Sequence, residues 1–327
     1  MSPRDTLEFL ALAALWGASF LFMRIAAPEL GPVPLMLLRC AIGAATLLPV
    51  LLYHGKGREL LANAGPLLLL GALNSALPFV LLGYATLTLT AGVTSIVNSL
   101  APLWTALIAF LWLGDRLTRL QILGLVLGAV GVAVLVGGGG DTGREAGIAA
   151  DRAGALARVA PSFAAAIAAT ACYGLAANFA RRSLVGVHPF ATATGSQLAA
   201  SAVLLVPGLL LWPEAAPLAT LSAGDPSGAT AGATGAVTGS VWLAAIALGV
   251  LCTGLAYLLF FRLITNIGAT RTIAVTFVIP LFGVGWGAWL LDERIDATSV
   301  VGAAVIVLGT ALTTGVLGGS GRRTVAR

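Results

Sequence analysis

The chain has 327 residues, of which 58% are hydrophobic and 9% are charged, and its mean hydropathy is +0.99. So much apolar surface exceeds what a water-soluble globule of this length could bury, so lipid must be the solvent for most of the chain. The net charge of +5 does not indicate nucleic-acid binding, because most basic residues lie in short gaps between apolar segments.

Cys40, Cys172 and Cys252 each lie singly within an apolar run, and the chain has only 2 histidines. No pair of cysteines has metal-ligand spacing. We therefore expect no disulfide, no bound metal and no cofactor. The first 17 residues contain a long apolar run, but Trp16 and Arg24 interrupt the pattern of a cleaved signal peptide. We expect this segment to be the first membrane span.

A membrane-spanning helix needs about 20 mostly apolar residues. Ten segments meet this requirement: 7–27, 33–53, 66–87, 93–113, 118–136, 160–180, 189–212, 241–262, 271–291 and 298–317. The predicted fold is therefore an all-α polytopic membrane protein. Because most gaps are short, neighbouring spans should pack as antiparallel pairs.

Two longer gaps divide the chain. Residues 137–159 form a glycine-rich linker, and residues 213–240 form a low-complexity loop that we expect to be mobile. The predicted organisation is a first repeat at 1–136, the outer linker, a second repeat at 160–317 and a basic tail at 318–327.

A repeat relates the two halves. A constant shift of 178 positions aligns residues 71–131 with 249–309. The matched pairs are Pro102 with Pro280, Asp115 with Glu293, Arg116 with Arg294, Gly124 with Gly302 and Gly131 with Gly309. Because each half has five spans, an odd number, the second half must enter the membrane with opposite orientation. We therefore predict two inverted-topology repeats.

Basic residues indicate the orientation of the chain, because they are enriched in cytoplasmic segments. With the N-terminus inside, the inner segments hold Arg4, Lys56, Arg58, Arg116, Arg119, Arg181, Arg182, Arg262, Arg271, Arg322, Arg323 and Arg327. The outer segments hold Arg144, Arg152, Arg158 and Arg294. We expect both termini to lie in the cytoplasm, in what we take to be a bacterial inner membrane.

Four segments of the two halves carry a recognisable pattern: ALWGASFLFMRIA, YATLTLTAGVTSIVNSLAPLWTALIAFLWLGDRLT, GLAYLLFFRLITNIGATRTIAVTFVIPLF and LLDERI. These segments resemble the EamA family of the drug/metabolite transporter superfamily. The resemblance covers almost the whole chain and includes two P-(x)10-L-(x)-[DE]-R blocks. It implies ten helices in two EamA repeats, alternating access through a central cavity, and export of small metabolites such as amino acids.

Polar side chains follow one helical face in several predicted spans. Ser95, Asn98 and Pro102 lie at i, i+3 and i+7, and similar faces occur in the third, eighth and ninth spans. Such faces line a cavity or form hydrogen bonds between helices. We interpret them, with an aromatic face in spans one and six, as a solute-binding cavity. The candidate residues are Trp16, Ser19, Asn74, Phe79, Ser95, Asn98, Tyr173, Thr253, Tyr257 and Thr276.

Other residues have two interpretations each. Pro78, Pro102 and Pro280 interrupt backbone hydrogen bonding inside spans, either as flexible points or as static kinks. Arg39 lies inside the second span; we expect its side chain to reach the outer surface, with contact to a substrate anion as the alternative. Glycines in spans five, nine and ten serve packing within the chain or a homodimer seam.

No Asp, Glu or His lies in the middle of a predicted span. Proton-coupled transporters usually carry such a residue, so we expect uniport or exchange of a small polar or zwitterionic solute. A carrier of nucleotide sugars or phosphate esters is the alternative, but it should have paired basic residues in its cavity. A membrane enzyme or a non-transporting scaffold is less consistent with the sequence, which shows no catalytic cluster at usable spacing.

Overall fold

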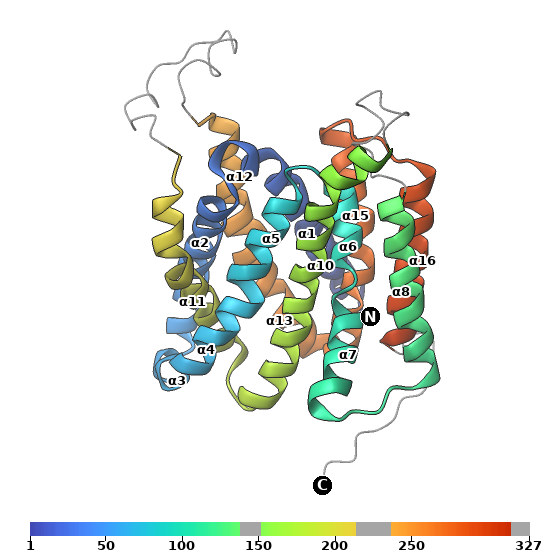
Figure 1. The fold of residues 1–327 in the computed structure, drawn as a ribbon. Helices are drawn as coiled ribbons and strands as arrows, with labels where there is room; N and C mark the ends of the chain where they lie inside the picture. Colours follow the sequence, from blue (N-terminus) through green and yellow to red (C-terminus); the bar gives the residue numbers. More distant parts are fainter. Residues whose placement is uncertain (138–151, 214–236, 315–327) are drawn as a thin grey trace.

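The computed structural model describes residues 1–137, 152–213 and 237–314, and the regular elements in these ranges are all helical (Figure 1). The predicted all-α fold is confirmed. The first half contains α1 (Pro3–Leu30), α2 (Pro32–Tyr53), α3 (Gly57–Ala62), α4 (Ala64–Gly71), η1 (Ala72–Ala76), α5 (Leu77–Ala85), α6 (Ala91–Asn98), α7 (Ala101–Leu113) and α8 (Arg119–Gly137). The second half contains α10 (Arg152–Ser183), α11 (Pro189–Leu210), α12 (Gly239–Gly249), η3 (Val250–Leu255), α13 (Ala256–Ile267), α14 (Ala269–Ile273), α15 (Val275–Leu290) and α16 (Ala297–Thr313).

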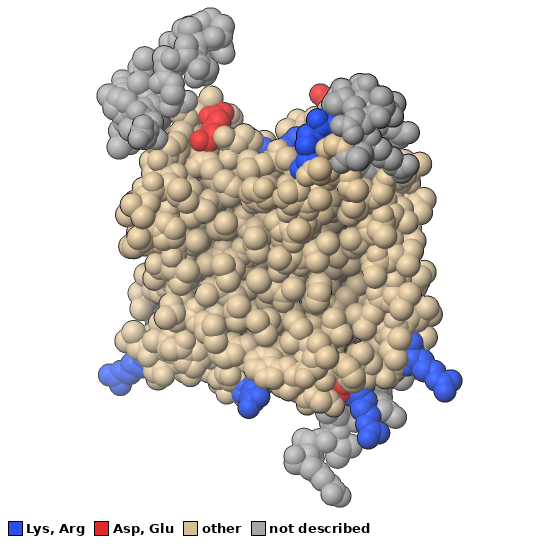
Figure 2. All heavy atoms as spheres, in the orientation of Figure 1, with Lys and Arg blue, Asp and Glu red and all other residues tan. Residues whose placement is uncertain are grey.

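These elements form ten spans. Within the described ranges, nine continuous helical stretches are long and apolar enough to cross a bilayer, and α16 is a shorter apolar helix. Figure 2 shows a broad uncharged band between two rims that carry the charged residues, as expected for a chain that crosses a membrane. The predicted central part of the linker, most of the predicted loop at 213–240 and the tail at 318–327 lie outside the described residues.

Two spans contain a short π-helical segment. In the third span η1 separates α4 from α5, and in the eighth span η3 separates α12 from α13. The shift of 178 positions that relates the halves carries Ala72, the first residue of η1, onto Val250, the first residue of η3. Segments of this kind occur frequently at functional sites, because they change the direction in which the following side chains point.

Prolines occupy three different helical contexts. Pro78 lies in the first turn of α5, directly after η1. Pro102 lies in the first turn of α7, after a turn at Ser99–Leu100 that interrupts the helix. Pro280 instead lies inside α15. Pro102 and Pro280, which match in sequence, therefore differ in structure: one follows a helix break and the other is part of a continuous helix.

Matching glycines join the two halves. A Cβ atom on Gly17 of α1 would lie 2.6 Å from Cβ of Phe282 on α15, and a Cβ on Gly174 of α10 would lie 2.7 Å from Cβ of Trp104 on α7. Trp104 and Phe282 are equivalent under the shift of 178. The first span of each half thus packs against the fourth span of the other half, as expected of inverted repeats related by a two-fold axis.

A second set of glycines joins α8 to α16. A Cβ on Gly124 would lie 2.4 Å from the carbonyl oxygen of Gly309, and a Cβ on Gly131 would lie 3.0 Å from the carbonyl oxygen of Gly302. Close backbone contact of this kind is a main source of attraction between helices in lipid, where the hydrophobic effect does not drive them together. These four glycines therefore serve packing within one chain.

We expect Gly131→Val to destabilise the protein by about 1–3 kcal/mol, because the new side chain must displace Ile306 and the backbone of α16. Thermal unfolding of purified protein in detergent measures the effect. Gly285→Ala is the matched control, since a Cβ there meets nothing within 4 Å. Equal unfolding temperatures for the two variants would contradict the close α8–α16 contact.

Candidate functional site

A cavity of about 810 Å³ lies between the two halves. Spans one, three and four of the first half and six, eight and nine of the second contribute to its wall, and α2 adds Arg39. Its size is typical of cavities that bind small molecules. Nine of the ten predicted binding residues line it: Trp16, Ser19, Asn74, Phe79, Asn98, Tyr173, Thr253, Tyr257 and Thr276.

Ser95 lies outside this group. Its side chain is fully buried and donates a hydrogen bond to the carbonyl oxygen of Gly92 at 2.7 Å. It also packs against Gly283 of α15, where an added Cβ would come within 2.3 Å of its hydroxyl. Pro102 lines the cavity, whereas Pro280 faces a separate groove. The polar face of the fourth span is therefore divided between helix packing and the cavity.

Arg39 points into the protein, so the expectation that its side chain reaches the outer surface is wrong. The residue is 4% exposed, and its Nε donates to Oγ1 of Thr253 at 3.1 Å. Its guanidinium carbon lies 3.8 Å from the ring centre of Phe79, and Nη2 lies 3.5 Å from the hydroxyl of Ser19. An aromatic face and two hydroxyls hold the guanidinium inside, which a linear count of residues from the helix end could not reveal.

Other polar groups on the wall have unused hydrogen-bonding capacity. Oδ1 of Asn98 is buried and has no partner among the described residues. Nδ2 of Asn74, within η1, donates to the hydroxyl of Tyr257 at 3.4 Å, so that side chains from both halves meet at the wall. Trp16 and Phe260 pack with ring centres 5.3 Å apart. The wall therefore combines aromatic surface with a few polar groups, as expected of a small-molecule site.

The cavity reaches one end of the bundle, which we call the Asp115 end. There it is lined by Asp115 and Arg181, whose carboxylate and guanidinium lie 2.9 Å apart and whose side chains are 48% and 54% exposed. Arg116 and Gln121 line the same mouth. In the sequence, Arg116 and Arg181 indicated only the orientation of the chain. Asp115 corresponds to Glu293 under the shift of 178, and Arg181 corresponds to Arg24 in the first span of the other half.

The opposite end, which we call the Glu293 end, is closed by the matching pair. The side chains of Arg24 and Glu293 are 29% and 12% exposed and lie 3.9 Å apart. Glu293 also accepts backbone hydrogen bonds from Ala91 at 2.9 Å and Gly92 at 3.3 Å, at the first turn of α6. A carboxylate at a helix N-terminus is stabilised by the free N–H groups and by the helix dipole. This end is therefore held together across the two halves.

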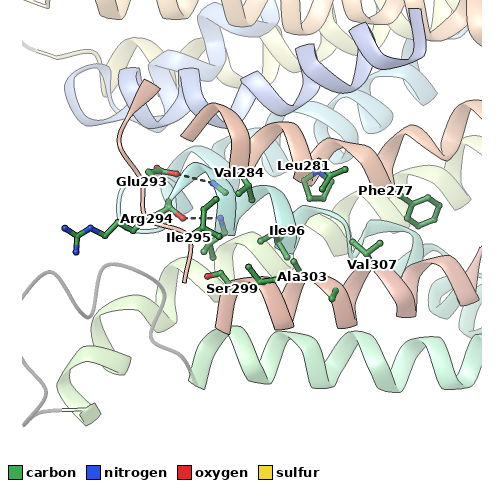
Figure 3. Close-up of a pocket in the computed structure, with 16 residues that line it drawn as sticks. Ile96, Phe277, Leu281, Val284, Glu293, Arg294, Ile295, Ser299, Ala303 and Val307 are labelled. Carbon is green, nitrogen blue, oxygen red and sulfur yellow. Dashed lines mark hydrogen bonds between the residues drawn. The ribbon is translucent and has the colours of Figure 1, made fainter. Parts of the chain in front are cut away.

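A second hollow, of about 400 Å³, lies beside the closed end between α6, α15 and α16. Figure 3 shows Ile96, Phe277, Leu281, Val284, Ala303 and Val307 along its wall, while the side chain of Arg294 extends away from it. Glu293 lies at one end of this groove, where a dashed line marks the hydrogen bond that it accepts from the backbone of Gly92. The wall is almost entirely apolar, so it suits hydrocarbon better than a polar solute.

Metal-binding chemistry finds no support in the described ranges: no group of three or more His, Cys, Asp or Glu side chains comes together there. The three cysteines are all free thiols. The polar groups that line the cavity include hydroxyls, amides and the guanidiniums of Arg39, Arg116 and Arg181, set among aromatic rings, and groups of this kind can bind a solute without a covalent step.

Ten helices in inverted repeats around a cavity open at one end define a membrane transport protein. The model of the EamA-like transporter family matches residues 7–137 and 161–315. The chain therefore belongs to this family, and its two matches correspond to the two halves of the fold. The predicted family is confirmed.

Named relatives share part of the chain. It is 29% identical over 120 residues to an uncharacterized transporter of Archaeoglobus fulgidus, and 31% identical over 122 residues to Protein PecM of Dickeya dadantii. Each match covers 37% of this chain, and they cover 43% and 39% of these relatives, less than half of each length. A solved crystal structure of a protein at 20% identity shares the fold with a TM-score of 0.61, over 97% of this chain and 99% of its own.

We expect single cysteines introduced by Asn98→Cys and Thr276→Cys to react with an impermeant maleimide supplied from the Asp115 end, because both positions line the cavity open to that end. The native cysteines are first replaced by alanine. Ser95→Cys is the matched control: it lies one turn from position 98 on the same helix but is fully buried, and it should not react. Two unreactive cavity positions would contradict a shared solvent-filled cavity.

Proposed function

We propose that this protein is a secondary transporter that moves a small polar or zwitterionic metabolite, of the size and polarity of an amino acid, through the central cavity. The observation that carries the proposal is a cavity of about 810 Å³ between two inverted repeats, with hydroxyls, amides and a guanidinium on an otherwise apolar and aromatic wall. A lipid-facing scaffold has no need to keep such polar groups at this depth.

Two ion pairs, each joining one half of the protein to the other, fit the closed and open ends that alternating access requires. Arg24–Glu293 is partly buried and Glu293 is hydrogen-bonded to α6, whereas Arg181–Asp115 is exposed at the open mouth. Because the pairs are equivalent under the internal symmetry, rocking of one half against the other exchanges their environments. The Asp115 end then closes as the Glu293 end opens, and the solute is released on the other side.

We place the Asp115 end in the cytoplasm, because the predicted inner segments hold most of the basic residues of the chain. In this orientation the structure represents the state that receives a solute from the cytoplasm, which is consistent with export. The bacterial inner membrane is the setting that we infer.

A carrier of nucleotide sugars or phosphate esters is the alternative. Such solutes carry two or more negative charges and call for several basic side chains around the phosphate. Among the described residues of the cavity wall, Arg39 is the one base in the deep part, and Arg116 and Arg181 lie at the mouth. A solute with one anionic group fits this arrangement better. We also infer that the protein is not an enzyme, since its family is one of transporters and the described part of the cavity wall brings together no nucleophile and base of the kind that catalysis requires.

The solute is identified by comparing the metabolites released into the medium by cells with and without the gene, followed by uptake of each differing compound into proteoliposomes. A compound that differs in the medium and enters protein-containing vesicles, but not empty ones, supports the proposal. No difference in either assay contradicts it.

We expect proteoliposomes with an imposed pH gradient but equal solute concentrations on both sides not to accumulate solute. The reason is that the middle of each predicted span lacks Asp, Glu and His, the residues that usually carry a coupling proton. A preloaded solute gradient serves as the positive control for transport. Accumulation driven by the pH gradient alone would overturn the prediction of uncoupled transport.

We expect Glu293→Gln to increase maleimide labelling of a cysteine at position 98 from the Glu293 end. Loss of hydrogen bonds to a charged group shifts the balance between closed and open states on the order of tenfold or more. Asp115→Asn, the symmetry-matched control, removes an exposed pair and should change this labelling less. Equal effects of the two variants would show that Glu293 does not hold this end closed.

A further inference from the structure

The deepest charge in the cavity wall has no counter-ion in the described part of the chain. Arg39 lies about 10 Å along α2 from Pro32, given a rise of about 1.5 Å per residue, and its described contacts are all neutral. No carboxylate of a described residue forms an ion pair with it. Arginine stays charged in proteins, and a buried unpaired charge is unfavourable. An anion that enters from the open mouth would remove this imbalance.

The internal symmetry shows that helix packing does not require this charge. Thr253, which accepts the hydrogen bond of Arg39, corresponds to Ser75 under the shift of 178. Ser75 accepts a hydrogen bond from Nε2 of Gln197 at 3.0 Å, and Gln197 lies on α11, the second helix of its half as α2 is of the first. A neutral amide thus makes the same contact in the second half. The charge of Arg39 is an addition to one half of an otherwise repeated arrangement.

The guanidinium also has hydrogen-bonding capacity to spare. It carries five N–H donors, of which Nε is used at 3.1 Å, while the contacts to Ser19 and Met23 are long, at 3.5 Å and 4.0 Å. The terminal nitrogens of arginine match the two oxygens of a carboxylate. Oδ1 of Asn98, also buried and without a described partner, offers an acceptor to an N–H or O–H group of the same solute.

We propose that Arg39 binds the carboxylate of the solute and makes the transporter selective for solutes that carry one. This inference rests on the proposed function and adds a substrate class to it. The solute then bears one carboxylate and an apolar or aromatic portion, which packs against rings such as Trp16 and Phe260. A cation without a carboxylate is excluded, because it would face the same uncompensated positive charge.

A charge series on one carbon skeleton tests the proposal. Binding to the full-length protein in nanodiscs is measured by calorimetry for 3-phenylpropionate, L-phenylalanine, L-phenylalaninamide and phenethylamine. Wild type is expected to bind 3-phenylpropionate and L-phenylalanine, which carry a carboxylate. It should bind L-phenylalaninamide and phenethylamine, which do not, on the order of tenfold to a hundredfold more weakly, the range that hydrogen bonds to charged groups produce.

Three variants separate charge from structure. Arg39→Gln reproduces the neutral contact of the second half, so it should fold and lose the preference for carboxylates. Arg39→Lys retains the charge without the fork of donors and should recover part of that preference. Arg58→Gln, an exposed arginine of α3, should leave all four affinities unchanged. A structural role for Arg39 would lower the affinities of all four compounds together.

Two results would overturn the proposal: failure of wild type to bind either carboxylate, and a preference for carboxylates that survives in Arg39→Gln. Metabolite release from cells that express wild type or Arg39→Gln distinguishes failure of the proposed role of Arg39 from failure of the proposed transport function. If Arg39→Gln releases the metabolite as wild type does, the protein is a transporter and only the proposed role of Arg39 is contradicted. Absence of release by wild type would contradict the transporter itself.

Discussion

Close backbone contact at matching glycines is the constraint on which the rest of this structure depends. In lipid, apolar side chains gain little by leaving their surroundings, so helices associate where their backbones can approach closely. Gly17 and Gly174 bring the first span of each half against the other half, and Gly124 with Gly309 does the same for α8 and α16. These contacts lie to the sides of the cavity. They fix the helices between which the cavity lies.

Much of this arrangement could be predicted from the sequence. The lengths of the apolar segments predict the membrane spans. The proline, acidic, arginine and glycine positions that recur in both halves predict the inverted repeat. The helical faces around Asn98 and Thr276 indicated the cavity wall, because a polar side chain at this depth must face protein or water. The same rule placed Ser95 in the cavity, where it does not lie. Polarity alone does not separate a side chain that is buried in a helix contact and hydrogen-bonded within its own helix, such as Ser95, from one that lines a cavity.

The direction of Arg39 could not be predicted, for a physical reason. Its distance from the helix end allows a flexible side chain to reach water, and only the tertiary positions of Phe79 and Thr253 hold it inside. The ion pairs at the two ends also depend on contacts between halves, more than 60 residues apart in sequence. Sequence periodicity shows which residues share a face of one helix, but it does not show which residues of other helices they contact.

The π-helical segments η1 and η3 place the same backbone irregularity in both walls of the cavity. Their first residues, Ala72 and Val250, are equivalent under the shift of 178 positions. The two halves carry different side chains on this shared geometry, among them Asn74 in one and Thr253 in the other. A solute in the cavity therefore meets two walls that are alike in backbone and different in chemistry.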